Sequence, residues 1–224
     1  MTPMSSQLAL PGAATLELPP VTAPIPAVEE LLAALTAGGA GATCNFYAGA
    51  DPDAGERRER LRRYLTAHWA APVVLVGEAP GYRGARRSGI PFTSEHQVLG
   101  HGMREATATI VHQVLAELSA GAQVLLWNAV PYHPHRRGAP QSNRPPNAAE
   151  IAACRELLAA VIAGRAVVAA GRTAASTLHE LGVAAAAVRH PSHGGKAAFA
   201  AGLAAVLAAE PAATVAARRP GGLP

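Results

Sequence analysis

Short apolar runs alternate along this chain with longer segments in which apolar residues recur every three or four positions. Continuous apolar runs are typical of buried strands, and they occur at Val73–Val76, Gln123–Val130, Ala166–Ala170 and Ala184–Val188. The periodic segments predict helices over Val28–Leu35, Glu56–Trp69, Arg104–Leu118, Asn147–Ile162, 171–182 and Lys196–Ala209. Regular alternation of strands and helices predicts an α/β fold, with a parallel sheet covered by helices on both faces.

The expected domain organisation is one domain with two tails. Residues 1–25 are rich in Pro, Ala and Thr and are predicted to be disordered, residues 26–209 form the domain, and residues 210–224 form a C-terminal tail. The first twenty residues lack a basic region and are broken by Pro11, Pro19 and Pro20, so no signal peptide is expected. No apolar run reaches the roughly 18–20 residues that span a bilayer, which predicts a soluble, cytoplasmic protein without a membrane partner.

The charge of the chain mildly favours an anionic partner. The net charge is +4 and the pI about 9.6, and Lys196 is the single lysine among 19 basic residues. This arginine bias has two explanations that stay open, phosphate recognition and the base composition of the genome. The predicted helix Glu56–Trp69 carries five of the arginines, which form either an ordinary solvated surface or a ridge that faces DNA.

Two cysteines, Cys44 and Cys154, are too few for a disulfide framework or for a site with four thiolates. No metal site and no cofactor are therefore expected.

The first strand ends abruptly at Gly77-Glu-Ala-Pro-Gly81, where glycine and proline stop regular structure. The loop that follows carries the carboxylate of Glu78, then three arginines and the ring of Phe92. Ligands of open parallel sheets bind at the carboxyl ends of strands. A carboxylate, arginines and a flat ring at such a place predict a pocket for a nucleobase.

Two other strands also end in polar residues. Asn128 closes the second strand, and His190 and Ser192 follow the fourth. Each has an ordinary structural explanation, such as capping a turn or satisfying loop backbone groups. Their repetition at the same edge of one sheet favours a shared functional site.

These segments together resemble the uracil-DNA glycosylase superfamily, and most of all its bacterial and archaeal iron–sulfur branch. The resemblance covers roughly residues 73–205 and rests on an ordered set of motifs: Gly77-Glu-Ala-Pro-Gly81, Gly89-Ile-Pro-Phe92, Asn128-Ala-Val130, Asn143-Arg-Pro-Pro146, Ala152-Ala-Cys-Arg155 and His190-Pro-Ser192. It implies a three-layer α/β/α fold around a four-stranded parallel sheet. It also implies a monomeric hydrolase that removes uracil, or a related deaminated base, from DNA in base excision repair.

The resemblance assigns roles to individual residues. Phe92 would stack on the extruded uracil, Asn128 would read its polar edge, and Asn143 would lie on a loop near the site. His190 would stabilise the departing base, and Glu78 would place or activate the attacking water. Other expected substrate contacts are Gly77, Ala79, Pro80, Gly81 and Ser192, and the expected DNA contacts are Arg83, Arg86, Arg87, Arg136, Arg137 and Lys196.

The sequence departs from the pattern of the family in three places. Tyr132 stands where the iron–sulfur branch has a cysteine, so cluster binding is not expected. Gly84 replaces an acidic residue beyond the first motif. The loop His193-Gly-Gly-Lys196 lacks a large apolar side chain to fill the gap left by a flipped base, which predicts weak activity on duplex DNA or a preference for single strands. A silent binding module and an enzyme acting on free nucleosides remain as alternatives.

Overall fold

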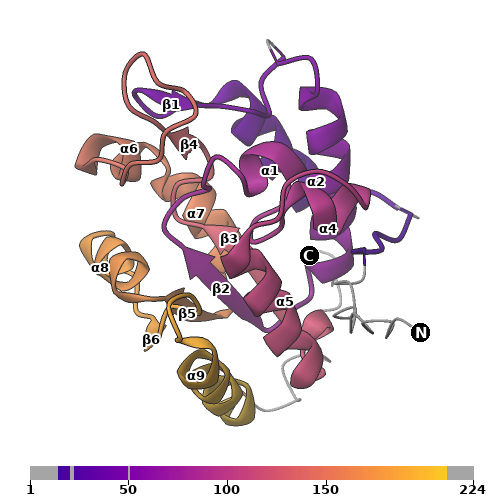
Figure 1. Ribbon diagram of the computed structural model, residues 1–224, viewed down its shortest axis with the longest axis vertical. Helices are drawn as coiled ribbons and strands as arrows, with labels where there is room; N and C mark the ends of the chain where they lie inside the picture. The colour runs from indigo at the N-terminus through magenta and orange to yellow at the C-terminus, as the bar shows by residue number, and fades with distance from the viewer. Residues whose placement is uncertain (1–14, 21–22, 50, 211–224) are drawn as a thin grey trace, which may run out of the picture.

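A computed structural model of the chain describes residues 15–20, 23–49 and 51–210 (Figure 1). The C-terminal tail beyond residue 210 and most of the predicted N-terminal tail lie outside these residues. At the centre is a four-stranded parallel sheet in the order β3-β2-β5-β6. Its strands are β2 (Val73–Gly77), β3 (Val124–Asn128), β5 (Ala166–Ala170) and β6 (Ala186–Val188). The predicted α/β class with a four-stranded parallel sheet is thus confirmed.

The central strand β2 explains why its sequence is continuously apolar. All five of its residues are buried, because neighbouring strands flank it on both sides and helices cover both faces. Its register with β3 pairs Val73 with Val124 and ends by pairing Gly77 with Asn128. The two motifs at these strand ends therefore lie side by side.

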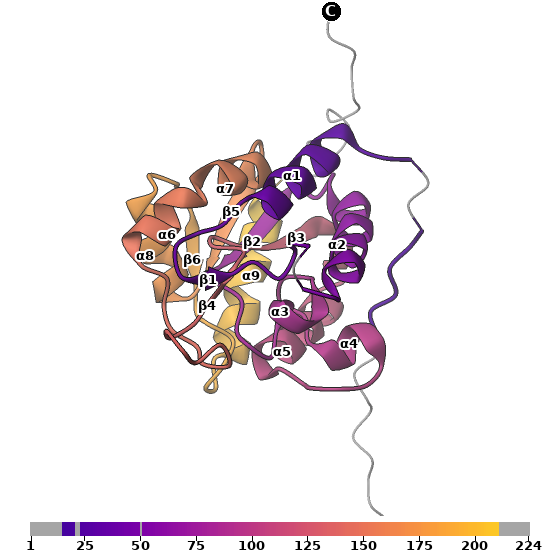
Figure 2. The ribbon, with the colours of Figure 1, turned by 90° about the horizontal axis from the view of Figure 1, so that it is seen from above.

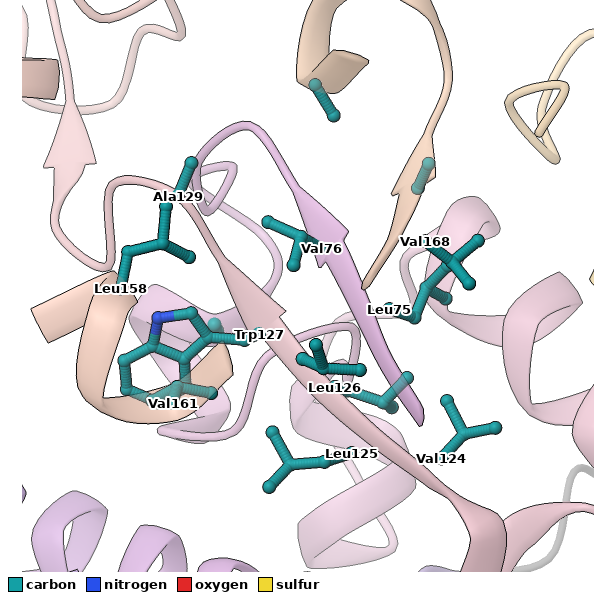
Figure 3. Packing of buried hydrophobic residues seen from close by; sticks show 14 of the residues in the cluster. Leu75, Val76, Val124, Leu125, Leu126, Trp127, Ala129, Leu158, Val161 and Val168 are labelled. Carbon is teal, nitrogen blue, oxygen red and sulfur yellow. The ribbon is translucent and has the colours of Figure 1, made fainter. Parts of the chain in front are cut away.

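Helices cover both faces of the sheet. Figures 1 and 2 show α7 (Arg155–Ile162) and α8 (Arg172–Glu180) on one side, and α5 (Ala106–Glu117) and α9 (Lys196–Ala209) on the other. Before the sheet come α1 (Pro26–Ala37) and α2 (Ala54–His68), which pack against each other. Figure 3 shows part of the core, with Trp127 projecting from β3 on the side where Leu158 and Val161 of α7 lie.

The remaining elements are short, and several were not predicted. They are β1 (Thr43–Cys44) paired with β4 (His133–Pro134), α3 (Ala85–Ser88), α4 (Glu95–Leu99), the 3-10 turn η1 (Gly121–Gln123) and α6 (Ala148–Ala153). The segment Asn147–Ile162, predicted as one helix, is two helices, α6 and α7, which meet at Cys154. Asn147 caps α6 through a capping box with Glu150, as its sequence predicts.

Two arginines of α2 bind groups inside the domain instead of lying on a solvated surface. Arg57 is only 3% exposed; it forms ion pairs with Asp51 and Asp53 and donates to the carbonyl of Phe46. Arg60 donates through Nε to the carbonyl of Ser88 at 2.8 Å. Arg57 and Arg60 therefore form their hydrogen bonds and ion pairs within the domain, and Arg60 binds the loop that follows β2.

Arg62 and Arg63, on the same helix, also have partners within the chain. Arg62 pairs with Glu29 of α1 and with Glu59, and Arg63 donates to the carbonyl of Pro19. A free ridge of cations facing DNA does not form on α2.

The segment 15–20, which the sequence places in a disordered tail, contacts the domain. Leu16 donates from its backbone N–H to the carbonyl of Gln97 at 2.6 Å, and Leu16 and Leu18 pack against the hydrophobic core. Among the described residues, no helix has the length and apolar character needed to cross a membrane.

Candidate active site

A cavity of about 1320 Å³ opens at the carboxyl edge of the sheet. Small-molecule pockets usually measure roughly 300–1,000 Å³, so this one has room for more than a single base. It brings together most of the residues expected at the site, namely Gly77, Glu78, Ala79, Pro80, Gly81, Arg83, Phe92, Asn128, Asn143, His190 and Ser192. The rule that parallel strands present their carboxyl ends at one edge explains why the sequence could place them together.

Gly77 allows an aromatic ring and an amide to meet over the end of β2. A Cβ at this position would lie 2.6 Å from Oδ1 of Asn128 and 2.7 Å from Cζ of Phe92. Any larger residue would push one of the two away. Asn128 is nearly buried, so its amide offers a donor and an acceptor in a place with little competing water.

The backbone of Phe92 is held in an unusual conformation. Its φ is +53°, in the left-handed region that non-glycine residues seldom adopt. Buried hydroxyl groups hold the turn: Thr93 donates to the carbonyl of Ile90 at 2.8 Å and to the hydroxyl of Ser88 at 2.7 Å. Burial lowers the pKa of His112 to about 4. Strain held in this way is common where a side chain must be aimed at a ligand.

His190 is oriented by the residue two positions later. The backbone N–H of Ser192 donates to Nδ1 of His190 at 3.3 Å, and the Ser192 hydroxyl lies 2.7 Å from the same nitrogen. Because a backbone amide only donates, Nδ1 is the acceptor and the proton of the neutral ring is on Nε2. Burial is the main cause of the lowered pKa of His190, which keeps the ring neutral at pH 7.

The position of His190 depends on Gly171, the first residue after β5. Gly171 has a φ of +93°, and its N–H donates to the carbonyl of Val188 at 2.9 Å. A Cβ on Gly171 would lie 2.8 Å from Cβ of His190. The glycine therefore lets the loop after β6 close against the end of β5.

Glu78 is the carboxylate on β2's side of the cavity. It is half-buried, and the loss of solvent raises its pKa above the ordinary value of 4.5. Its backbone carbonyl accepts from the N–H of Val130 at 2.9 Å, which fixes the chain there. Its side chain has no hydrogen-bond partner among the described residues, so its oxygens can accept a proton from a water or a substrate.

Asn143 joins the long loop after β4 to the loop after β2. Its Oδ1 accepts from the backbone N–H of Tyr82 at 2.8 Å. The same long loop is held at its base by Arg144, which binds the fully buried carboxylate of Glu150 at 2.6 Å. Asn143 therefore shapes the wall of the cavity, and its amide nitrogen remains for a ligand.

The basic residues expected to contact DNA fall into two groups. Arg83 lines the cavity, and Arg136 and Arg137 are exposed on the long loop after β4. The others have partners within the chain: Arg86 lies 4.6 Å from the ring centroid of Tyr82, Arg87 pairs with Glu95, and Lys196 pairs with Glu117.

Several residues that line the cavity were not found by sequence reasoning. Glu105 caps α5 by accepting from the N–H groups of Thr107 and Ala108, and it faces the same cavity as His190. Nothing in its sequence neighbourhood distinguishes it from any other helix cap. The start of α8 also lines the cavity, and the signal was present there, since Gly171-Arg-Thr173 directly follows a strand.

The residues do not fit an iron–sulfur cluster. Such a cluster needs about four thiolates, whereas the whole chain has two cysteines. Tyr132 is buried and donates its hydroxyl to the carbonyl of Leu35 at 3.1 Å. Burial raises its pKa to about 12, with a smaller contribution from nearby Cys154. Within residues 15–20, 23–49 and 51–210, no group of three or more His, Cys, Asp or Glu side chains could hold a metal ion.

The chain is a three-layer α/β/α protein with a large cavity at the carboxyl edge of its sheet. The model of the uracil DNA glycosylase superfamily matches residues 63–214, which is more than half of the sequence. The chain therefore belongs to this superfamily, as its motifs predict. A comparison with curated proteins found no match.

Solved structures show the same fold. The crystal structure of wild-type Pedobacter heparinus SMUG2 superposes with a TM-score of 0.62, at 11% sequence identity. The match covers 82% of this chain and 97% of that one. At so low an identity the likeness concerns the arrangement of the elements and does not extend to the side chains of the cavity.

Proposed function

We propose that this protein is a DNA glycosylase that hydrolyses the N-glycosidic bond of uracil, or of a related deaminated base, in DNA. The observation that carries the proposal is the convergence of four groups in one cavity: the ring of Phe92, the amide of Asn128, the Nε2–H of His190 and the carboxylate of Glu78. Base excision needs an extruded nucleotide, a face on which to stack it and hydrogen bonds to its edge. Membership of the superfamily supports the same reaction class.

The aromatic ring and the amide would bind the base. Phe92 stands beside the Asn128 amide over Gly77, so a flat base lying on the ring would present its polar edge to that amide. The Asn128 side chain can donate and accept at once, which matches the adjacent N–H and carbonyl of uracil.

His190 would stabilise the leaving group. When the bond between C1′ and N1 breaks, its electron pair stays with the base, and negative charge collects on a carbonyl oxygen of uracil. The ring orientation fixed by Ser192 leaves the Nε2–H of His190 as a donor. A donor that binds the anion better than the neutral base lowers the barrier, because only that difference accelerates the reaction.

Glu78 would complete the hydrolysis. A water molecule attacks C1′ of the sugar and loses a proton to the Glu78 carboxylate, so that the products are free base and an abasic site. The raised pKa makes this carboxylate a better proton acceptor than an exposed one. With Gly84 at the position of the acidic residue of the family pattern, Glu78 takes on this step without that second carboxylate.

Release of uracil from a labelled oligonucleotide tests the proposal. The His190→Ala variant is expected to lose about 10²-fold or more in excision rate, the scale seen when a preorganised donor is removed. It should still bind DNA that contains a non-cleavable uracil analogue, because Phe92 and the arginines remain. His179→Ala is the matched control, since His179 is exposed on α8 and does not line the cavity.

Two results would contradict the proposal in different ways. Full activity of His190→Ala would remove this cavity from the chemistry. A wild-type protein that releases neither uracil, hypoxanthine nor xanthine from either strand state would instead be a binding module.

A further inference from the structure

A protein that extrudes a base from duplex DNA leaves a gap in the stack, and such proteins often fill it with an apolar side chain. The loop after His190 offers none, because its residues are His193, Gly194 and Gly195. Nor can the loop easily gain one at its end, since a Cβ on Gly195 would lie 2.0 Å from the carbonyl oxygen of His190. A side chain that fills the gap must come from another element.

Two large apolar side chains are exposed in the part of the chain that the structure describes, Leu99 at 38% and Met103 at 42%. Leu99 lines a second cavity, which it shares with Leu16 and Leu18 of the N-terminal segment. It is therefore directed at the chain's own residues. Met103 does not line that cavity, so of the two exposed side chains it is the one not directed at the N-terminal segment.

The backbone of Met103 is fixed although its side chain is free. Its N–H donates to Oε2 of Glu95 at 3.1 Å, and its carbonyl accepts from the N–H of His96 at 3.0 Å. Gly102 makes this close approach possible, with a φ of +83° and no Cβ, which would lie 2.5 Å from the Glu95 carboxyl group. Glu95 is itself paired with Arg87 at 2.7 Å. These contacts fix the backbone of Met103, so that its side chain can enter DNA without a rearrangement of the loop.

Met103 also lies near the cavity along the chain. Glu105, two residues further on, lines that cavity, and two residues of extended chain span at most about 7 Å. Figure 2 shows the connection from α4 to α5 on the lower edge of the molecule, the same side as the loop that leads into α9. The exposed Arg104 follows Met103 directly and can meet a phosphate next to the gap.

We propose that Met103 is the apolar wedge that enters the duplex in place of the extruded nucleotide, an inference that rests on the proposed glycosylase function. Methionine suits this role because its unbranched, polarizable side chain adapts to irregular gaps. The wedge then comes from the loop between α4 and α5 rather than from the loop after the His190 motif. With such a wedge duplex DNA is a substrate, whereas the sequence alone predicts weak activity on duplex DNA or a preference for single strands.

The test compares excision from the same uracil-containing strand, free and in a duplex. Met103→Ala should lower the duplex rate at least tenfold and change the single-strand rate by less than twofold, since a single strand has no stack to hold open. Leu99→Ala is the matched control, because it removes an equally exposed apolar side chain that faces the other cavity, and it should leave both rates unchanged. Both substitutions spare the backbone contacts.

A second measurement does not depend on cleavage. A 2-aminopurine placed beside a non-cleavable uracil analogue in a duplex becomes brighter when the stack opens. Binding of the wild type should produce this increase, and Met103→Ala should lose most of it.

The outcomes separate the two proposals. If the wild type cleaves single strands alone, or if Met103→Ala matches the wild type on the duplex, Met103 is no wedge while the glycosylase function stands. If the wild type cleaves neither substrate, the glycosylase function fails. The fluorescence then decides on Met103 by itself, with a Met103-dependent increase supporting the wedge and its absence refuting it.

Discussion

Burial shifts the pKa values of two residues in this cavity in opposite directions. Glu78 has lost solvent, which raises its pKa, and His190 has lost solvent too, which lowers its pKa. The shift at Glu78 makes its ionised carboxylate a stronger base, although it narrows the pH range in which that form is populated, and the shift at His190 favours the neutral imidazole. The same burial thus prepares a proton acceptor and a hydrogen-bond donor.

The pH dependence of excision should report Glu78. Only the ionised carboxylate accepts a proton, so the rate should rise with pH through the pKa of Glu78 and level off above it. Because burial raises this pKa, the midpoint of the acid limb is expected above 4.5. Glu78→Gln should lower the plateau by about 10²-fold and abolish this limb.

The measurement is a single-turnover rate profile on single-stranded uracil DNA between pH 4 and pH 8. His96→Gln, an exchange outside the cavity, should leave the profile unchanged. A midpoint at or below 4.5 in the wild type would show that the site leaves Glu78 in water.

Whether a site residue could be predicted from the sequence depends on the element that carries it. Glu78, Asn128 and His190 could be predicted to meet, because each lies at the carboxyl end of a strand and parallel strands share an edge. The positive φ of Phe92 and the Ser88 and Thr93 hydroxyl groups that hold it depend on contacts within a loop, which have no periodic signal. Glu105 reaches the site only because α5 starts there.

Among the elements, the strands and long helices follow from the sequence and the short helices do not. The pattern of apolar residues predicts both β2 and α9. Strand β2 is buried along its whole length, and α9 buries the side chains of one face. Helices α3 and α4 have four and five residues, too few for a period to show. They are stabilised by the arginines of α2 and by the Ser94 capping box rather than by their own propensity.

The ion pair between Arg144 and Glu150, at the base of the loop after β4, should stabilise the folded state. The Glu150 side chain is 0% exposed, and Arg144 binds it with two nitrogens at 2.6 and 2.7 Å. Arg144→Met leaves a buried carboxylate without its cation, which should cost about 3–5 kcal/mol of unfolding free energy at pH 7. Adding Glu150→Gln to this variant should restore part of the loss.

Acid should weaken this difference. The ion pair lowers the pKa of Glu150 below 4.5, so its contribution is complete above that pH and is lost as pH falls through the pKa of the folded state. Urea unfolding of the wild type and Arg144→Met at pH 7 and pH 4 measures this. A difference that stays constant between the two pH values would assign the effect to packing instead of charge.

For the whole molecule, the carboxyl edge of the sheet combines a large cavity with exposed arginines. A cavity of about 1320 Å³ reaches from the loop after β2 to the start of α8, so a base and part of its backbone can lie in it together. Arg83 lines this cavity, and Arg136 and Arg137 lie exposed on the loop after β4, while the arginines of α2 serve the interior. The distribution of the charge, rather than its sum of +4, makes this edge suitable for a nucleic acid.

The support that α2 gives to the loop after β2 has a consequence for where this protein can be cut. The match to the superfamily begins at residue 63, near the end of α2, so α1 and most of α2 precede it. Yet Arg57 and Arg60 bind backbone carbonyls of the loop that carries Phe92. A chain shortened to residues 63–214 would lose these anchors together with the buried leucines of α1. The first residue of the family match therefore lies inside a helix whose preceding part holds the loop that carries Phe92.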